Sequence, residues 1–163
     1  MKGIVTMRKY STCLWFDGQA EEAARFYVSI FPNSKVIDML RWGEGGHGLK
    51  GSVLTCEFEL DGHHYIALNG GPQYQFTPAI SLVINCETQA EVDRYWSAFL
   101  QGGKEQACGW ITDKFGVSWQ VTPTMLPRLL KDPDQAKADR VMAAMMKMIK
   151  LDIAVLQQAA DAR

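Results

Sequence analysis

Side chains suited to nucleophilic or metal chemistry are few in this sequence and widely spaced. The histidines are His47, inside the glycine-rich segment 43–48, and the adjacent pair His63 and His64. Neighbouring side chains of a strand point to opposite faces, so the pair does not readily give two ligands to one metal ion. We expect it to flank a turn at the surface. The spacing assigns no Ser-His-Asp or Cys-His catalytic set.

The four cysteines predict neither a metal site nor a disulfide framework. They are about evenly spread, with no C-x-x-C pair and no adjacent histidine (Cys13, Cys56, Cys86 and Cys108). Cys13 and Cys56 lie in apolar or alternating runs, which favours small buried side chains over ligands or nucleophiles. Unpaired thiols are typical of a reducing compartment, and we expect a cytoplasmic protein.

The glycine-rich segment 43–48 is another candidate for ligand contact. It lacks the lysine followed by serine or threonine of a phosphate-binding loop, and it joins two predicted strands. We expect a mobile hairpin loop over a cavity, in which His47 either contacts a ligand or lies in solvent. Among the tryptophans on predicted strands, we expect one or two to line a pocket and the others to be core (Trp15, Trp42, Trp110 and Trp119).

The composition restricts the class of protein. The 163 residues suffice for one domain or two small modules, and 47% of them are hydrophobic. The 17 basic and 18 acidic residues nearly cancel, which argues against nucleic-acid binding because that needs clustered positive charge. No run of apolar residues is long enough to predict a membrane span, and the N-terminal residues lack the apolar core of a secretion signal. We expect a globular protein with no nucleic-acid or membrane partner.

The first half of the chain predicts a strand, a helix and three further strands. Residues 10–16 are aromatic and apolar, as in a strand. In residues 19–31 the apolar side chains recur at helical spacing, Asp17 is positioned to cap the first turn, and Pro32 ends the helix. The dipeptide Asp61-Gly62 predicts a hairpin turn between the last two of three strands, at 34–42, 52–60 and 63–69.

The second half repeats this order about 68 residues later. A strand predicted at 79–85 leads to a capping box, Thr88 with Glu91, and then to an apolar helical stripe that ends at Gly102-Gly103. Further strands are predicted within 105–112 and at 117–122. The internal repeat predicts an α+β fold of two strand-helix-strands modules.

The C-terminal part predicts helices instead of strands. Asp132 is positioned as a helix cap with Pro133 at the first helical position, and Asp152 as the cap of a last short helix. Four methionines give an adaptable apolar surface, which suits core packing or a contact between subunits (Met142, Met145, Met146 and Met148).

These patterns predict the organisation of the chain. We expect a domain of residues 1–123 with two modules, at about 8–76 and 77–123, followed by a helical extension at 124–163. Small curved sheets leave apolar edges, and the methionine-rich helix adds adaptable surface. We therefore expect a homodimer.

Several segments resemble the PhnB-like family, and together they cover nearly the whole chain. They are L-W-F-D-G-Q-A-E-E-A-A-R-F-Y-V-S-I-F-P-N-S, G-S-V-L-T-C-E-F-E-L-D-G, A-L-N-G-G-P, C-G-W-I-T-D-K-F-G-V-S-W-Q-V-T-P and K-L-D-I-A (residues 14–34, 51–62, 67–72, 108–123 and 150–154). The family is part of the vicinal oxygen chelate superfamily, with glyoxalase I, bleomycin-resistance proteins and extradiol dioxygenases. The resemblance implies paired βαβββ modules that each curl a sheet around a cavity, often completed across a homodimer.

Members of this family are often labelled demethylubiquinone methyltransferases. Methyl transfer from S-adenosylmethionine normally needs a doubly wound sheet with a glycine-rich nucleotide loop, and the sequence shows neither. We therefore do not expect methyltransferase activity.

The chemistry of the superfamily depends on a divalent metal, held by His, Glu or Gln side chains of the strands. The metal binds two adjacent oxygens of the substrate. The resemblance puts Thr12, Asn69, Ser81 and Gln120 at the positions of those ligands. Hydroxyl and amide groups hold a transition metal poorly compared with imidazole and carboxylate. We expect no complete metal site.

Two hypotheses of function follow. In the first, the protein is a metal-free, dimeric small-molecule-binding protein with a cavity lined by Trp15, Phe58, Trp110 and Trp119. In the second, it is an enzyme of glyoxalase or dioxygenase type with a weakly held divalent metal, and its pocket uses Thr12, Asn69 and Gln120 with His47 or Glu57. The missing metal ligands favour the first hypothesis, in which no cofactor is needed.

Overall fold

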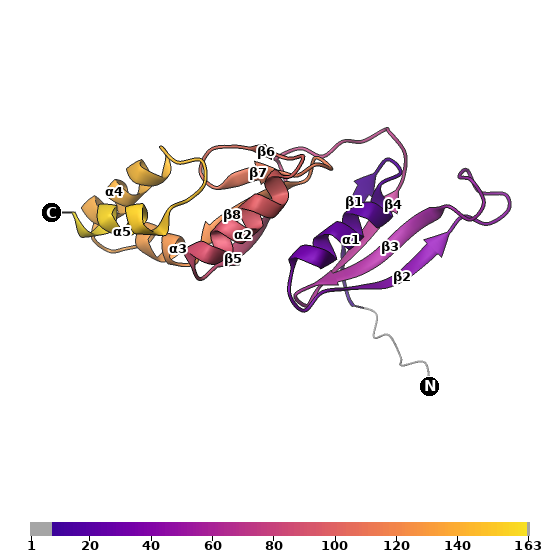
Figure 1. Cartoon of the computed structure of the whole chain (residues 1–163), viewed down its shortest axis with the longest axis horizontal. Helices are drawn as coiled ribbons and strands as arrows, with labels where there is room; N and C mark the ends of the chain where they lie inside the picture. The colour runs from indigo at the N-terminus through magenta and orange to yellow at the C-terminus, as the bar shows by residue number, and fades with distance from the viewer. Residues whose placement is uncertain (1–7, 163) are drawn as a thin grey trace. The chain divides into compact units, whose positions relative to one another are not determined.

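The computed structural model describes residues 8–162, which fall into two compact units divided between Gln75 and Phe76 (Figure 1). The first unit contains β1 (Thr12–Phe16), α1 (Ala20–Ile30), β2 (Lys35–Arg41), β3 (Val53–Leu60) and β4 (His63–Asn69). The second begins in the same order, with β5 (Ser81–Cys86), α2 (Gln89–Leu100), β6 (Lys104–Glu105), β7 (Trp110–Thr112) and β8 (Ser118–Pro123). It continues with α3 (Met125–Leu130), α4 (Gln135–Met145) and α5 (Ile153–Asp161). The repeated βαβββ order confirms the predicted α+β fold.

Both sheets have four strands in corresponding order. The first sheet runs β1-β4-β3-β2 and the second β5-β8-β7-β6. In each sheet the first and last strands of the module are parallel neighbours, and the other pairs are antiparallel. The parallel pairing places side chains from distant parts of the sequence next to each other, such as Thr12 of β1 beside Tyr65 of β4.

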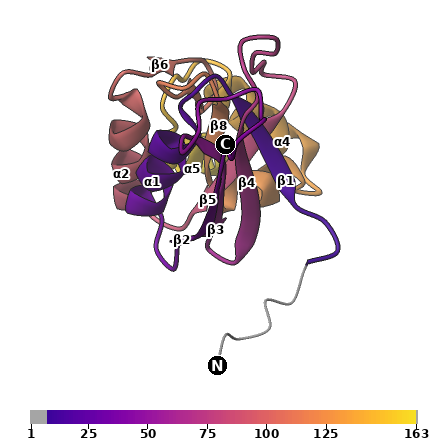
Figure 2. The same cartoon turned by 90° about the vertical axis from the view of Figure 1, so that its right-hand side faces the viewer.

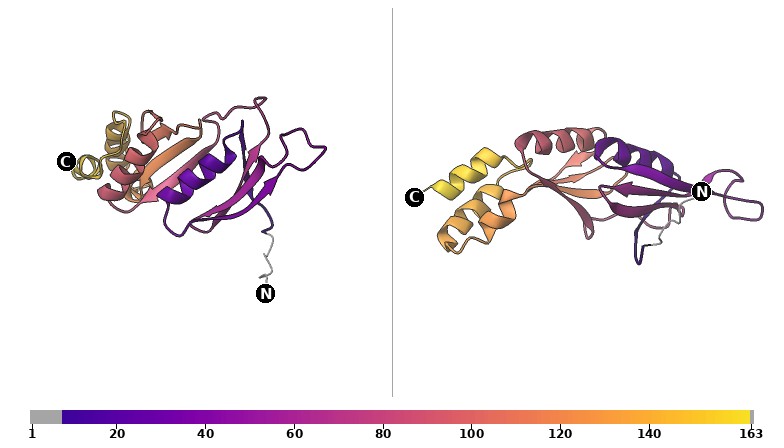
Figure 3. Two further views of the ribbon diagram at one scale, coloured as in Figure 1. Left: turned by 45° about the vertical axis from the view of Figure 1, so that its right-hand side comes forward. Right: turned by 90° about the horizontal axis from the view of Figure 1, so that it is seen from below.

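Each module helix covers one face of its own sheet (Figures 2 and 3). α1 packs mainly on β3 and β4 and buries Ala20, Ala23, Ala24 and Tyr27. Because strand side chains alternate, every second residue points toward the helix, as Leu14 and Phe16 do on β1. The opposite face of each sheet carries the remaining strand side chains. We call these two surfaces the first and second far faces.

The helix α1 is capped by a residue from a distant strand. Its N-cap residue, Gln19, makes no side-chain cap, and the Ala20 backbone N–H donates to Asn69 Oδ1 at 2.9 Å. Asn69 Nδ2 donates in turn to the Val53 carbonyl at 3.0 Å. The predicted Asp17 cap is therefore wrong. The first amide of the helix is satisfied by a tertiary contact, which local sequence does not reveal.

Two local predictions are confirmed. Asp61 and Gly62 both have positive φ, 44° and 85°, as a two-residue hairpin turn with an Asp-Gly pair requires. At the start of α2, Thr88 Oγ1 accepts from the Glu91 backbone N–H at 3.2 Å. The Glu91 carboxylate accepts from the Glu87 backbone N–H at 2.6 Å, one residue before the expected partner.

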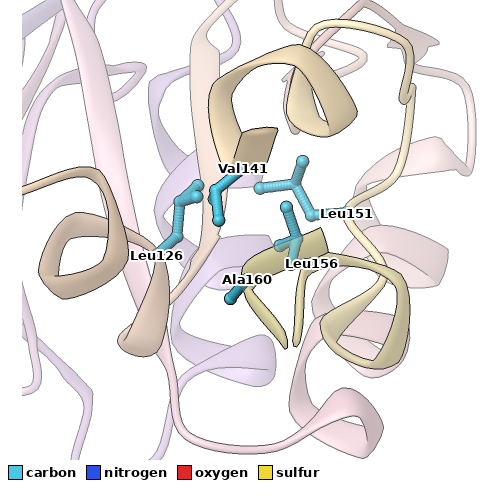
Figure 4. Close-up of a cluster of buried hydrophobic side chains, with 5 residues drawn as sticks. All are labelled: Leu126, Val141, Leu151, Leu156 and Ala160. Carbon is cyan, nitrogen blue, oxygen red and sulfur yellow. The ribbon is translucent and has the colours of Figure 1, made fainter. Parts of the chain in front are cut away.

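The three C-terminal helices share an apolar cluster (Figure 4). Leu126 of α3 and Val141 of α4 pack there with Leu151, Leu156 and Ala160. The six-residue helix α3 was not predicted from the sequence. Its proline, Pro127, lies in the first turn, where the backbone amides have no partner within the helix, so it does not interrupt the hydrogen bonding.

The N-terminal caps of α4 and α5 agree only in part with those predicted from the sequence. For α4 the predicted Asp132 cap is wrong, because Asp134 Oδ1 accepts from the Lys137 backbone N–H at 3.2 Å. Asp132 instead accepts from the Asp134 backbone N–H, at 3.0 Å. The Asp152 cap is confirmed, with the Val155 backbone N–H 3.0 Å from Asp152 Oδ1.

The four cysteines are free thiols. Cys56 is buried, as predicted, and Cys86 is buried as well. The prediction for Cys13 is wrong, because this residue alternates with the buried Leu14 and is exposed. Within residues 8–162, no helix has both the length and the apolar character needed to cross a membrane.

Candidate ligand-binding site

The second far face carries a row of polar side chains next to a tryptophan. Alternation along β8 puts Gln120 and Thr122 on this face, whereas Trp119 and Val121 are buried toward α2. Trp110 of β7 stands opposite Gln120 in the antiparallel register. An aromatic ring and an amide are therefore neighbours on the same surface.

This surface forms one side of an open hollow of about 330 Å³. The remaining wall comes from the C-terminal helices and is mainly apolar. The lining residues are Cys108, Trp110, Gln120 and Thr122 from the sheet and its preceding turn, and Leu126, Pro127, Leu130, Lys131 and Met145 from the C-terminal helices. Lys131 is the cationic side chain among them. The hollow thus combines an apolar wall, two hydrogen-bonding groups and one positive charge.

Gln120 has hydrogen-bonding capacity that its own unit does not use. Its Nε2 donates to Ser81 Oγ on β5 at 2.8 Å. Neither Gln120 Oε1 nor the Thr122 hydroxyl forms a hydrogen bond with another residue in the described part of the chain. In the same row Ser118 is 2% exposed, and its hydroxyl has no partner among residues 8–162. Buried polar groups are normally satisfied, so the Ser118 hydroxyl suits an ordered water, whereas Gln120 Oε1 and the Thr122 hydroxyl line the hollow and are open to a ligand.

Two residues from the predicted site belong to the cores of the units. Trp119 stacks on Phe99 of α2, with 4.6 Å between ring centroids, and its Nε1 donates to Asp113 Oδ2 at 2.9 Å. Phe58 is fully buried and lies 5.2 Å from the Tyr65 ring, in stacked geometry. Both rings point toward the helix of their module and stabilise its contact with the sheet.

Two other predicted residues lie near loops of the first unit. Trp15 of β1 packs against the Gly70-Gly71 segment that follows β4. Its Nε1 donates to the Gly71 carbonyl at 2.8 Å, and its ring meets Tyr74 edge-on at 5.0 Å. His47 lies exposed in the loop between β2 and β3. This loop folds onto Trp42, whose ring occupies the space that side chains at Gly46 and Gly48 would need.

The remaining predicted residues do not gather in one place. Thr12 lines a hollow at the start of β1, and Asn69 lines another beside the start of α1. Trp110 and Gln120 are the two predicted residues that share a hollow. The structure adds Thr122, Leu130 and Lys131 to them. Because side chains alternate along a strand, the sequence could have indicated that Thr122 lies on the same face as Gln120. The C-terminal side of the hollow could not be predicted, because it is formed largely by α3, a helix that the sequence did not predict.

The residues at the expected metal-ligand positions do not fit a divalent metal. The oxygen of the Asn69 side chain already accepts from the Ala20 backbone N–H at the start of α1, and its nitrogen donates to the Val53 carbonyl. Hydroxyl and amide groups are also weak ligands for transition metals. Over residues 8–162, no three His, Cys, Asp or Glu side chains lie close enough together to hold a metal ion.

Comparison with known proteins extends these observations. A family model described as 3-demethylubiquinone-9 3-methyltransferase matches residues 8–122. The structure of a PhnB protein from Bacillus cereus is 36% identical in sequence, with a TM-score of 0.67. The match covers 72% of this chain and 100% of the Bacillus chain. No curated protein matches the sequence.

Two less similar structures share the fold. A protein from Pseudomonas aeruginosa is 21% identical over 72% of this chain and 98% of its own, with a TM-score of 0.60. The fosfomycin resistance protein FosX from Mesorhizobium loti is 13% identical over 77% of this chain and 100% of its own, with a TM-score of 0.52. At such identities the likeness concerns the fold alone, and it agrees with paired βαβββ modules.

Proposed function

The chain belongs to the PhnB-like family whose model is described as 3-demethylubiquinone-9 3-methyltransferase, and from this we propose that it binds a small organic molecule in the hollow of its second unit. One observation carries the proposal. Trp110, Gln120 and Thr122 face the apolar side chains of the C-terminal helices across one open space. Small-molecule sites are typically apolar hollows with a few placed polar groups.

The lining restricts the kind of ligand. An aromatic or aliphatic body would pack between Trp110 and Leu126 or Leu130, and a polar group would reach Gln120 Oε1 or the Thr122 hydroxyl. Lys131 adds attraction for a negative charge at one side. The volume of about 330 Å³ is at the lower end for ligand pockets. We therefore propose a compact amphipathic ligand with an acidic or hydrogen-bond-donating group.

The description of the family model as a methyltransferase is not part of this proposal. Nucleotide cofactors of the S-adenosylmethionine type are normally held at the switch point of a doubly wound parallel sheet. Both sheets here mix parallel and antiparallel pairs in four strands. The glycine-rich segment between β2 and β3 joins two antiparallel neighbours, not a strand and a helix. The fold therefore supports ligand binding without that cofactor.

Binding is tested by screening compact aromatic acids and amides against the full chain with ligand-observed NMR. We expect hits whose affinity falls at least tenfold in Trp110→Leu. Trp42→Leu is the matched control, since Trp42 contacts the β2–β3 loop instead of this hollow. If both variants lose binding equally, or if neither variant weakens the binding of any hit, the hollow is not the binding site.

The metal-dependent enzyme is the alternative, and it has its own experiment. Metal content is measured by mass spectrometry on untagged protein that was never exposed to a chelator. Thermal melts are then repeated with Ni²⁺, Zn²⁺, Mn²⁺ and Fe²⁺. A stoichiometric metal and a clear rise in melting temperature would favour the enzyme, because a ligand that binds the native state stabilises it. Neither result is expected from the donor groups described above.

We also propose a cytoplasmic homodimer in which residues 124–163 are an extension of a glyoxalase-like domain of residues 1–123. Exposed apolar side chains on the C-terminal segments support the dimer, namely Met142, Met146, Ile149 and Val155. The family model ends at residue 122, which supports the boundary of the extension. Sedimentation of a monomer at micromolar concentration would exclude the dimer.

A further inference from the structure

A serine, a histidine and a glutamate form a hydrogen-bonded chain in the first unit. His64 Nδ1 lies 2.6 Å from Ser11 Oγ, and His64 Nε2 lies 3.1 Å from Glu57 Oε2. A single imidazole tautomer satisfies both contacts: Nε2–H donates to the carboxylate, and Nδ1 accepts from the hydroxyl. We propose that these three side chains act as nucleophile, base and positioning carboxylate in the hydrolysis of short-chain carboxylic esters.

The sheet topology brings these three side chains together. The parallel register pairs Thr12 with Tyr65, so Ser11, one residue earlier, lies beside His64. In the antiparallel β3–β4 pair, Glu59 is opposite His64, and Glu57 is two positions further along the same face. Such diagonal neighbours are within reach of long side chains. The three groups come from separate segments, which explains why their spacing in the sequence gives no motif.

The exposure of the groups suits their proposed roles. Ser11 is exposed and open to a substrate, whereas the His64 side chain is only 15% exposed. The imidazole is held between its two partners, which fixes the ring that would take the serine proton. An accessible nucleophile, a hydrogen-bonded base and a third group that orients the base are the signature of an activated serine.

A small hollow of about 200 Å³ adjoins the serine. Arg8, Lys9, Tyr10 and His63 line it together with Ser11 and His64. Arg8 is fixed by an ion pair of 2.8 Å with Glu59. Because this carboxylate offsets the charge of Arg8, Lys9 is the group whose charge favours the negative charge that develops on the carbonyl oxygen during attack. The small volume limits the acyl group to a few carbons.

The reaction balances without a cofactor. Ser11 Oγ forms a bond to the ester carbonyl carbon, and its proton moves to His64 Nδ1. The bond from that carbon to the alkoxy oxygen breaks, and the leaving alcohol takes the proton from His64. Water then attacks the acyl carbon with His64 as base, the bond from that carbon to Ser11 Oγ breaks, and His64 returns the proton to Ser11. The sum is ester plus water giving carboxylic acid plus alcohol.

The test uses the full chain, diisopropyl fluorophosphate as covalent probe and p-nitrophenyl acetate as substrate. We expect the fluorophosphate to modify Ser11, as shown by peptide mapping, and not to modify it in His64→Gln. Turnover of p-nitrophenyl acetate should fall at least about tenfold in Ser11→Ala and in His64→Gln. Glu57 is a positioning residue, so Glu57→Gln should lower kcat and leave KM unchanged.

Ser29→Ala is the matched control for Ser11→Ala, because Ser29 is exposed on α1 and lies outside both the hydrogen-bonded group and its hollow. It should keep both the labelling and the turnover, while circular dichroism and melting temperature verify the fold of every variant. The proposal is overturned if Ser11 is not labelled, or if Ser11→Ala keeps its turnover, since a surface imidazole would then be acting alone.

Discussion

Gln120 of β8 donates from Nε2 to Ser81 Oγ of β5 at 2.8 Å and thereby holds its amide in one orientation above the second far face. The bond links the two parallel strands that begin and end the second module. It also leaves Oε1 without a partner among residues 8–162 at the wall of the hollow. A fixed amide with one unused acceptor is well suited to select ligands by their hydrogen-bond donors, because little side-chain freedom remains to be lost on binding.

Replacement of this amide should separate binding from stability. Gln120 is only partly buried, so we expect Gln120→Ala to change the free energy of unfolding by less than about 1.5 kcal/mol. Ligands found in the NMR screen should bind at least about tenfold more weakly, since a polar contact in the hollow is lost. Chemical denaturation and titration of the same protein give both quantities. Loss of stability with unchanged affinity would make Gln120 a structural residue.

The Gln89 side chain should hold α2 against the C-terminal segment through hydrogen bonds to the backbone of that segment. Its Nε2 donates to the Leu151 carbonyl at 3.1 Å, and its Oε1 accepts from the Ile153 backbone N–H at 2.9 Å. Loss of both bonds in Gln89→Ala should destabilise the fold by about 1–3 kcal/mol. Hydrogen exchange should be faster at Ile153. Gln157→Ala is the control, because the Gln157 side chain makes an exposed hydrogen bond to Asp161 within the same helix.

Strand alternation sets a limit on which predicted site residues can act together. Trp119 and Gln120 are sequence neighbours on one strand and therefore point to opposite faces, so they cannot line the same hollow. The apolar pattern alone did not say which face α2 covers. The stacking of Trp119 on Phe99 assigns that face, and it leaves the other to Trp110 and Gln120.

Local structure could be predicted from the sequence where a few neighbouring residues determine the backbone conformation. The Asp61-Gly62 turn and the Thr88 cap follow from backbone conformation and local hydrogen bonding. Contacts between distant strands were not predictable in this way. The Asn69 cap of α1 and the pairing of Ser11 with His64 both depend on β1 lying parallel to β4, a register that no local motif encodes.

Gly103 should tolerate no side chain. A Cβ atom at this position would lie 2.1 Å from the Phe99 carbonyl oxygen and 2.5 Å from the Thr112 carbonyl oxygen. Both are backbone atoms, one in α2 and one in β7, so a rotamer change does not relieve the clash. We expect Gly103→Ala to cost about 2 kcal/mol or more. In Gly43→Ala, the control, nothing lies within 4 Å of the new Cβ, and thermal melts should show little change.

Cys86 should be the least reactive thiol at neutral pH. Burial, with a smaller contribution from the Glu91 carboxylate, raises the pKa of its thiol to about 11. At pH 8 only about one molecule in a thousand then carries the thiolate, which is the form that iodoacetamide attacks. The exposed Cys13 and the half-buried Cys108 should be alkylated first. Peptide mapping after timed alkylation gives the order, and early labelling of Cys86 would contradict the packing of β5 on α2.

The raised pKa of Cys86 also predicts how stability changes with pH. A thiol whose pKa is raised by folding stays neutral in the native state up to about pH 11, whereas in the unfolded chain it ionises from its ordinary value of 9.0. The native state therefore holds its full stability below pH 9 and loses this contribution as the pH rises to 11. The free energy of unfolding falls by about 1.4 kcal/mol for each pH unit between these two pKa values. In Cys86→Ala, urea denaturation should show a shallower decline over this range than in the unmodified chain.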